Sequence, residues 1–250
     1  MKIMGVNESL GRLQGLLDTH TKVYYVRFGD GDILLMSNSI KQTSGNKQKT
    51  SAGLRFDLLE SFNIDNPLYL RAASGSYPTE PGMVVGLFAP FGNREQLDKI
   101  LSEQLDKSVK EFFNPALFHY LAVFKPKLLR TFIDKYIRNQ SKMFIGGCSK
   151  ENMEKFLGPI DVYVKTPLVS SCDSIDQWWE KIEKNLEGIK VIVLAAGHAS
   201  RVIAKRLWNM NVNAHCIDIG SVVDPVDGKF DTRTCWKMKG REVMEYFCNV

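Results

Sequence analysis

The feature that most constrains this chain is a regular alternation of short apolar runs and amphipathic segments in its second half. The expected elements are strands at 142–145, 161–164, 190–195 and 212–219, with helices at 149–156, 175–186 and 199–210. Strands that alternate with helices in this way form parallel sheets through right-handed crossovers. The sequence therefore predicts an α/β, Rossmann-like fold, with a mostly parallel sheet and helices on both faces.

The first half is less regular but contains the same kinds of element. The expected elements are helices at 7–20, 33–36 and 51–62, strands at 22–28 and 68–72, and a mostly helical stretch at 94–139. Residues 39–50 are polar and predict a surface loop, whereas 74–93 are rich in Gly, Pro and aromatic residues and predict an irregular segment. Because no convincing linker divides the chain, we expect a single domain over 1–250 with a helical or irregular insertion at about 74–140.

Composition excludes several classes of protein. The chain is 44% hydrophobic and 24% charged, which is typical of globular proteins and excludes a mainly disordered or fibrous chain. The net charge of +5 is mild and the basic residues do not form a stripe, so a nucleic-acid partner is not expected. Five cysteines without a CxxC pair, no signal-peptide pattern and no apolar run of roughly 18–20 residues predict a cytoplasmic protein without a transmembrane segment.

In open α/β sheets, ligands bind beyond the carboxyl ends of the strands. The polar residues that follow each predicted strand are therefore the candidates for a site. They are Asp30 and Asp32, the loop at 146–149, the loop at 197–200, and Asp218, Gly220 and Asp224. We expect these segments to share one edge of the sheet.

The sharpest of these patterns is the run from Arg27 to Asp32. Two carboxylates one residue apart can converge on a hard divalent cation, and Mg²⁺ or Mn²⁺ often takes one or two carboxylates together with substrate phosphates. Gly29 and Gly31 leave room for a diphosphate to approach. Asp30 and Asp32 are therefore candidate ligands of Mn²⁺ or Mg²⁺; the alternative is an ordinary Asp-Gly turn after a strand.

Weaker signals lie in the later loops. Gly197, His198 and Ser200 stand between a predicted strand and a helix, where free backbone N–H groups can bind an anion, although the same pattern serves as a packing turn in many βα units. The chain has neither a GxGxxG nor a Walker A loop, which argues against a dinucleotide enzyme or a P-loop NTPase. Ser149 is a plausible helix N-cap, and Cys148 has no evident base that would make it a nucleophile.

Two segments resemble one known family. The run YYVRFGDGDILLM resembles the Arg-Phe-Gly-Asp-Gly-Glu segment of the GT-D type glycosyltransferases. The run VIVLAAGHASRVIAKRLWNMNVNAHCIDIGSVVD is similar to the closing βαβ unit of that family, in which the last strand ends in Asp-Ile-Gly. The resemblance covers both ends of the core but leaves about 74–140 unmatched.

The resemblance implies a Rossmann-like domain that binds a nucleotide-sugar, such as a UDP-sugar, through a divalent metal. Asp30 matches the first acid of the family's Asp-x-Glu motif and Asp32 stands in place of its Glu, which favours coordination by Asp32 through a water. Arg27 matches the motif's arginine, a cation suited to a diphosphate. Gly197 and the Asp218–Gly220 pair match the second segment, whereas His198 matches no family residue that we can assign.

The expected activity is metal-dependent transfer of a sugar to a glycan, lipid-linked or protein-linked acceptor. An inverting enzyme needs a base for the acceptor hydroxyl, and the candidates are Asp224, Asp218 and Glu80. Two alternatives remain open: a metal-dependent phosphohydrolase or nucleotidyltransferase on a similar sheet, and a non-catalytic nucleotide-binding or nucleic-acid-associated module, which the net charge of +5 suggests.

Overall fold

A six-stranded, entirely parallel sheet forms the centre of the protein. The computed structural model describes residues 2–37, 52–78, 94–103, 111–167, 172 and 174–248. The strands run in the order β3-β2-β8-β7-β5-β6. Their bounds are β2 Tyr24–Phe28, β3 Tyr69–Ala73, β5 Lys142–Gly146, β6 Val162–Lys165, β7 Val191–Ala195 and β8 His215–Asp218. The predicted α/β class with a mostly parallel sheet is confirmed.

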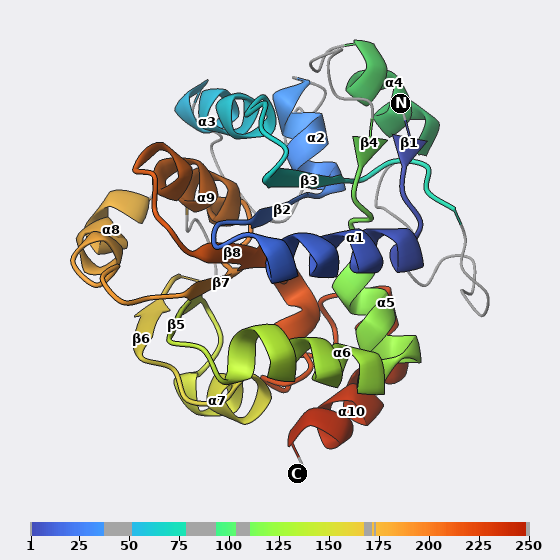
Figure 1. Cartoon of the computed structure of the whole chain (residues 1–250). Helices are drawn as coiled ribbons and strands as arrows, with labels where there is room; N and C mark the ends of the chain where they lie inside the picture. The colour runs from blue at the N-terminus through green and yellow to red at the C-terminus, as the bar shows by residue number, and fades with distance from the viewer. Residues whose placement is uncertain are drawn as a thin grey trace.

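Helices cover both faces of this sheet (Figure 1). One layer holds α2 Asp30–Met36, α3 Ala52–Phe62, α4 Arg94–Glu103, α8 Ile175–Glu183 and α9 Ala199–Asn209. The other layer holds α1 Val6–Thr19, α5 Leu117–Phe124, α6 Pro126–Ile133, the π-helical turn η1 Asp134–Arg138, α7 Lys150–Leu157 and α10 Thr234–Cys248. A short 3₁₀ turn, η2 Gly220–Val223, follows β8.

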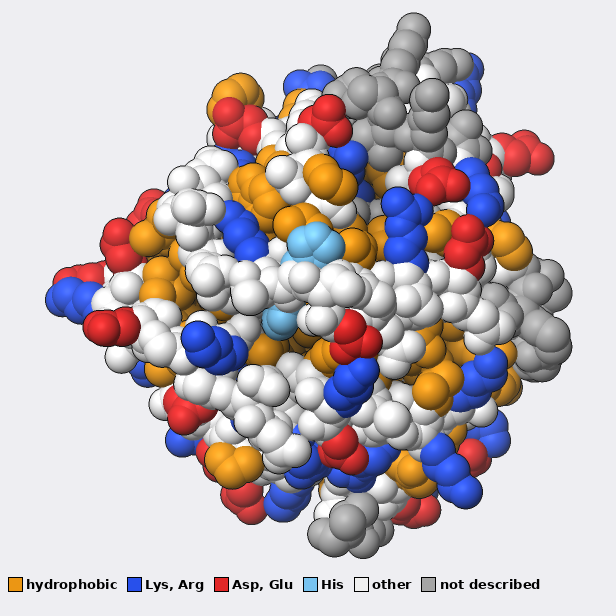
Figure 2. Space-filling model, in the orientation of Figure 1, with side chains coloured by type: hydrophobic (Ala, Val, Ile, Leu, Met, Phe, Trp, Pro, Cys, Tyr) orange, Lys and Arg blue, Asp and Glu red, His pale blue; other side chains and the backbone are white. Residues whose placement is uncertain are grey.

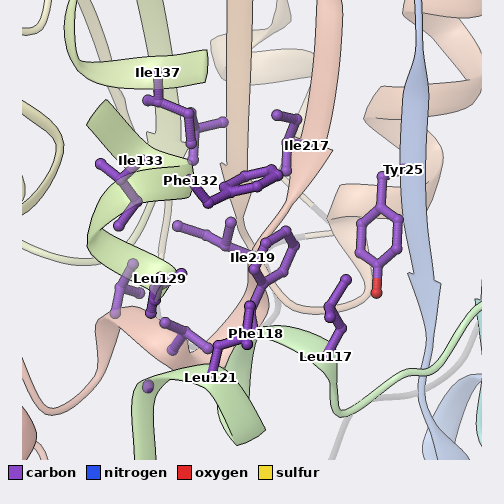
Figure 3. Close-up of a cluster of buried hydrophobic side chains, with 14 of the residues drawn as sticks. Tyr25, Leu117, Phe118, Leu121, Leu129, Phe132, Ile133, Ile137, Ile217 and Ile219 are labelled. Carbon is purple, nitrogen blue, oxygen red and sulfur yellow. The ribbon is translucent and has the colours of Figure 1, made fainter. Parts of the chain in front are cut away.

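Alternation along the strands explains why the sheet separates two cores. In β2, Tyr24, Val26 and Phe28 face one core, whereas Tyr25 faces the other. Figure 3 shows the second core, where Phe118 from α5 and Phe132 from α6 pack beside Ile217 of β8. Both faces of the sheet are therefore buried under apolar side chains, as expected for parallel strands.

The region at about 74–140 is part of this single domain. Its described residues include β4 Glu111–Phe112, which pairs in parallel with β1 Lys2–Ile3, and the buried helices α5 and α6. The short β1–β4 pair was not predicted from the sequence, because two-residue strands carry too little pattern. The loop predicted at 39–50, and the residues 79–93 that include Glu80, lie outside the described residues.

Two helices differ from the expectations. α2 begins at Asp30 instead of residue 33, so both acids of the Asp-Gly-Asp pattern lie in its first turn. Acidic residues are favourable there because they face the positive end of the helix dipole. The closing helix α10 was not predicted; its buried positions, among them Trp236, Val243 and Phe247, are separated by Lys, Arg and Glu, which weakens its apolar pattern.

Among the described residues, no helix combines the length and the apolar character that crossing a bilayer requires. On the face drawn in Figure 2, the described Lys and Arg side chains are interspersed with Asp and Glu instead of forming a basic stripe.

Candidate functional site

Three neighbouring strands bring the predicted site residues to one edge of the sheet. β2 pairs with β8, and β8 pairs with β7, all in parallel. Their carboxyl ends lead into Gly29–Asp32, Asp218–Gly220 and Gly197–His198, respectively. The sequence analysis expected these segments to share one edge, and the strand order brings them together.

Arg201 on α9 ties two of these segments to each other. Its guanidinium lies 2.9 Å from Asp32 Oδ2 and 3.4 Å from Asp218 Oδ2, and it also donates to the carbonyl of Gly197. All three charged side chains are buried. A buried cation shared by two buried carboxylates holds the ends of β2 and β8 in fixed relative positions, because separating them leaves a carboxylate buried without this cation.

Asp32 is saturated with partners. Its Oδ2 accepts the Gly29 N–H at 2.8 Å, which is the carboxylate half of a capping box on α2. Its Oδ1 lies 2.6 Å from His198 Nδ1. Burial raises the pKa of Asp32, but the charges of Arg201 and His198 and these hydrogen bonds outweigh burial and lower it to about 2. Asp32 is therefore ionised at neutral pH.

Asp218 is equally enclosed at the end of β8. Its Oδ1 accepts the Gly220 N–H at 3.0 Å and its Oδ2 accepts the Arg27 N–H at 3.3 Å. Burial raises the pKa of Asp218, and Arg201 and Arg27 offset part of this rise. With no exposed surface, Asp218 supports the edge of the sheet, and this position does not favour the role of catalytic base.

The guanidinium of Arg27 packs directly against Gly220. Its Nε donates to the Pro115 carbonyl at 2.9 Å and its Nη1 to the Ile219 carbonyl at 3.3 Å. Gly220 has a φ of +55°, and a Cβ built on it would lie 1.7 Å from Arg27 Nη1. Glycine is therefore required here both by the backbone conformation and by the close approach of the guanidinium.

The loop between β7 and α9 places His198 at the surface and Ser200 inside. Gly197 has a φ of +60°, which favours glycine. The Ser200 Oγ accepts the Ala196 N–H at 3.1 Å and the side chain is fully buried, so Ser200 stabilises the loop. The His198 side chain is 31% exposed. Of the two side chains, only His198 is in a position to meet a ligand.

A second group of polar residues follows β8. Asp224 is half-buried, accepts from Thr232 Oγ1 at 2.6 Å, and has a pKa raised by burial. Ser221 Oγ lies 2.8 Å from His119 Nε2 and accepts from Arg233 Nε at 3.3 Å. Burial, with the nearby charges of Arg27 and Arg233, lowers the pKa of His119 well below its usual range, so this imidazole is neutral.

The loop at 146–149 is closed to an anion. Ser149 caps α7 by accepting the Asn152 N–H, and Asp227 accepts from both the backbone and the hydroxyl of Ser149 at 3.0 Å. A carboxylate therefore already occupies the N-terminus of α7. Burial raises the pKa of Cys148 to about 12, so this thiol is protonated and is not a ready nucleophile.

The structure allows a test of whether Asp30 and Asp32 fit a divalent cation. Asp30 is half-buried at the first position of α2, where one carboxylate can serve beside phosphate oxygens. Asp32 uses both oxygens for Gly29, His198 and Arg201. Asp30 therefore fits as a direct ligand, whereas Asp32 fits only as a second-layer partner; metal binding itself stays a prediction.

The sequence analysis missed the residues that organise this site. Arg201 lies one helical turn after His198, a spacing that places both at the same end of α9. His119 was available as a lone polar residue in the otherwise apolar segment LFHYLAVF. In both cases the signal was a polar side chain at a position that its helix buries.

Comparisons with solved structures identify the fold. One similar structure is described as the selenomethionine-substituted domain of unknown function 1792; it is 15% identical, with a TM-score of 0.66, over 96% of this chain and 82% of that chain. In a second, with a TM-score of 0.64 and the same identity and coverage, this highly conserved domain is described as having a distinct glycosyltransferase fold. No protein-family profile and no curated protein matches this chain. At this identity the likeness establishes the class of fold, a single α/β domain of the kind described for that glycosyltransferase-fold domain.

Proposed function

We propose that this protein is a glycosyltransferase that uses a nucleotide-sugar, of the UDP type, as donor and a glycan or a lipid- or protein-linked saccharide as acceptor. The observation that carries the proposal is the group of charged residues at the carboxyl ends of β2, β8 and β7, on a fold like that of a domain described as a glycosyltransferase fold. The resemblance of the 24–36 and 191–224 segments to the GT-D type supports the same activity.

The chemistry follows from the charges at this edge. Sugar transfer leaves negative charge on the departing diphosphate, and preorganised positive charge there is the main source of catalysis. Bound Mn²⁺ or Mg²⁺ would supply such charge, with Asp30 as a ligand. Arg27, held against Gly220 by hydrogen bonds to two carbonyls, would add a fixed positive charge next to this edge.

Asp224 is the residue that we assign as base for the acceptor hydroxyl. A base is most effective when its pKa is raised toward the working pH, and burial raises the pKa of Asp224. Asp224 is half-buried at the end of η2, whereas Asp218 has no exposed surface that an acceptor could reach.

A donor panel tests the proposal. The wild-type protein, given Mn²⁺ and a series of nucleotide-sugars, should hydrolyse one donor slowly without an acceptor. Asp30→Asn should lower this rate by at least about 100-fold with an unchanged melting temperature, because a mispositioned diphosphate loses several kcal/mol of transition-state stabilisation.

The matched control is Asp176→Asn, which removes an exposed carboxylate on α8. It should retain the wild-type rate. Full metal-dependent activity in Asp30→Asn would overturn the assignment of Asp30. Phosphate release from simple esters without any sugar would instead identify a phosphohydrolase.

A further inference from the structure

The two acids of the Asp-Gly-Asp pattern point in different directions. Asp30 and Asp32 occupy the first and third positions of α2. Successive residues of an α-helix are rotated by about 100°, so side chains two residues apart diverge by about 200°. Asp32 is accordingly buried, whereas Asp30 is half-buried. A cation next to Asp30 therefore needs its second protein ligand from another element.

His198 is oriented to provide that ligand. The 2.6 Å contact places Asp32 Oδ1 against His198 Nδ1. A histidine that binds a metal in this orientation donates from Nδ1 to the carboxylate and offers its lone pair at Nε2. Among the residues that the structure describes, Nε2 has no hydrogen-bond partner, and the side chain is 31% exposed.

The position of Gly31 shows where Nε2 lies. A Cβ built on Gly31 would lie 3.3 Å from His198 Cε1 and 3.9 Å from Nε2. The imidazole thus lies over Gly31, with Nδ1 bonded to Asp32 on one side and Nε2 beyond Cε1 on the other. Gly31 separates Asp30 from Asp32 in the sequence, and its lack of a side chain leaves room for the ring.

The geometry points to a divalent-cation site in which His198 Nε2 and Asp30 are the protein ligands and Asp32 orients the histidine. Metal-binding histidines almost always donate their other N–H to a carboxylate or carbonyl, and Asp32 supplies that carboxylate. An imidazole ligand favours Mn²⁺ over Mg²⁺, which prefers oxygen. This site deepens the proposed function. The role of the cation in catalysis rests on that function, whereas the ligands are inferred from the geometry.

Mn²⁺ alone, without nucleotide or sugar, tests this site. Electron spin echo spectra of the protein with bound Mn²⁺ should show modulation from a coordinated ¹⁴N, and labelling the histidines with ¹⁵N should change it. His198→Ala should remove the modulation and weaken Mn²⁺ binding by at least about 10-fold. The matched control is His20→Ala, because His20 is exposed after α1, at the opposite end of β2.

Two further variants separate the roles of the neighbours. Asp32→Asn should weaken Mn²⁺ binding by about 10- to 100-fold, as loss of a second-layer partner does. Gly31→Ala should weaken it without removing any ligand, because the new methyl crowds Cε1, while the melting temperature stays the same or rises with the better helix former.

Bound Mn²⁺ without nitrogen modulation, or equal Mn²⁺ affinity in His198→Ala and wild type, would overturn this site. These results leave the proposed function intact if a nucleotide-sugar is still hydrolysed. Conversely, nitrogen-coordinated Mn²⁺ in a protein that hydrolyses no nucleotide-sugar would support the site and contradict the proposed function.

Discussion

Arg201 is the residue on which the geometry of the candidate site most depends. It is 7% exposed and compensates two buried carboxylates, Asp32 and Asp218. Arg201→Ala should lower the free energy of unfolding by about 3–5 kcal/mol, because it removes from two buried acids the cation that they share. Urea unfolding measures this change.

The same helix offers a control for that prediction. Arg206 pairs with the exposed Asp176, and a surface pair contributes only about 0–1 kcal/mol. Equal losses in Arg201→Ala and Arg206→Ala would contradict the view that the buried network holds β2 and β8 together.

Gly220 gives a second prediction at the scale of one residue. Gly220→Ala places a methyl in a left-handed conformation and against Arg27, which is held by the Ile219 and Pro115 carbonyls. Gly188 also has a positive φ, but its Cβ position is open. Thermal or urea unfolding should show a loss of about 1–2 kcal/mol for Gly188→Ala from backbone strain alone, and a clearly larger loss for Gly220→Ala. Equal losses would show that Arg27 moves aside freely.

At this scale the sequence predicted which segments meet better than how deeply each of their residues is buried. The positions after β2, β7 and β8 indicated which residues would meet, because parallel strands share a carboxyl edge. The burial of individual side chains could not be predicted from the sequence. Asp32, Asp218 and Ser200 are buried, although they follow strands in the same pattern as exposed site residues do. The shared partner of the two acids, Arg201, lies in a helix, where a charged residue usually indicates a face exposed to solvent.

Among the elements, α7 shows how an acid from another segment, Asp227, can stabilise a helix N-terminus. Burial raises the pKa of Asp227, but hydrogen bonds from Lys229, Ser149 and Asn152 outweigh it and lower the pKa to about 2. A folded-state pKa below the unfolded value stabilises the protein at higher pH, and the contribution is lost as the pH falls through the folded pKa. The carboxylate of Asp227 should therefore contribute up to about 2 kcal/mol near neutral pH and little near pH 2.

Comparing Asp227→Asn with wild type measures this contribution. The difference in free energy of unfolding should be present at pH 6 and should shrink between about pH 4 and pH 2, since the unfolded acid becomes protonated over that range and the folded acid begins to be protonated near its end. A difference that does not change with pH would show that Asp227 acts through packing instead of charge.

The elements also show why some boundaries escape prediction. The expected start of α2 is three residues too late. Gly29, Asp30 and Asp32 are typical of a turn as well as of a helix N-terminus, so the pattern did not show that the helix already begins at Asp30. The strands β5 and β7 were predictable because their apolar runs are nearly continuous, as is typical of buried parallel strands. α10 was missed because its few buried residues are separated by charged ones.

For the whole molecule, the central claim is that one edge of the sheet, at the ends of β2, β8 and β7, binds the donor's diphosphate. The alternative edge position, the N-terminus of α7 after β5, is already capped by Asp227. The fold itself follows from strand–helix alternation and is shared with a domain described as having a glycosyltransferase fold.

The most direct test is a crystal structure of the protein soaked with Mn²⁺ and UDP. We predict anomalous density for Mn²⁺ next to Asp30 and His198, with the diphosphate above Gly29 and Gly31. Density for the nucleotide at another edge of the sheet, with neither ion nor phosphate near these residues, would contradict the account.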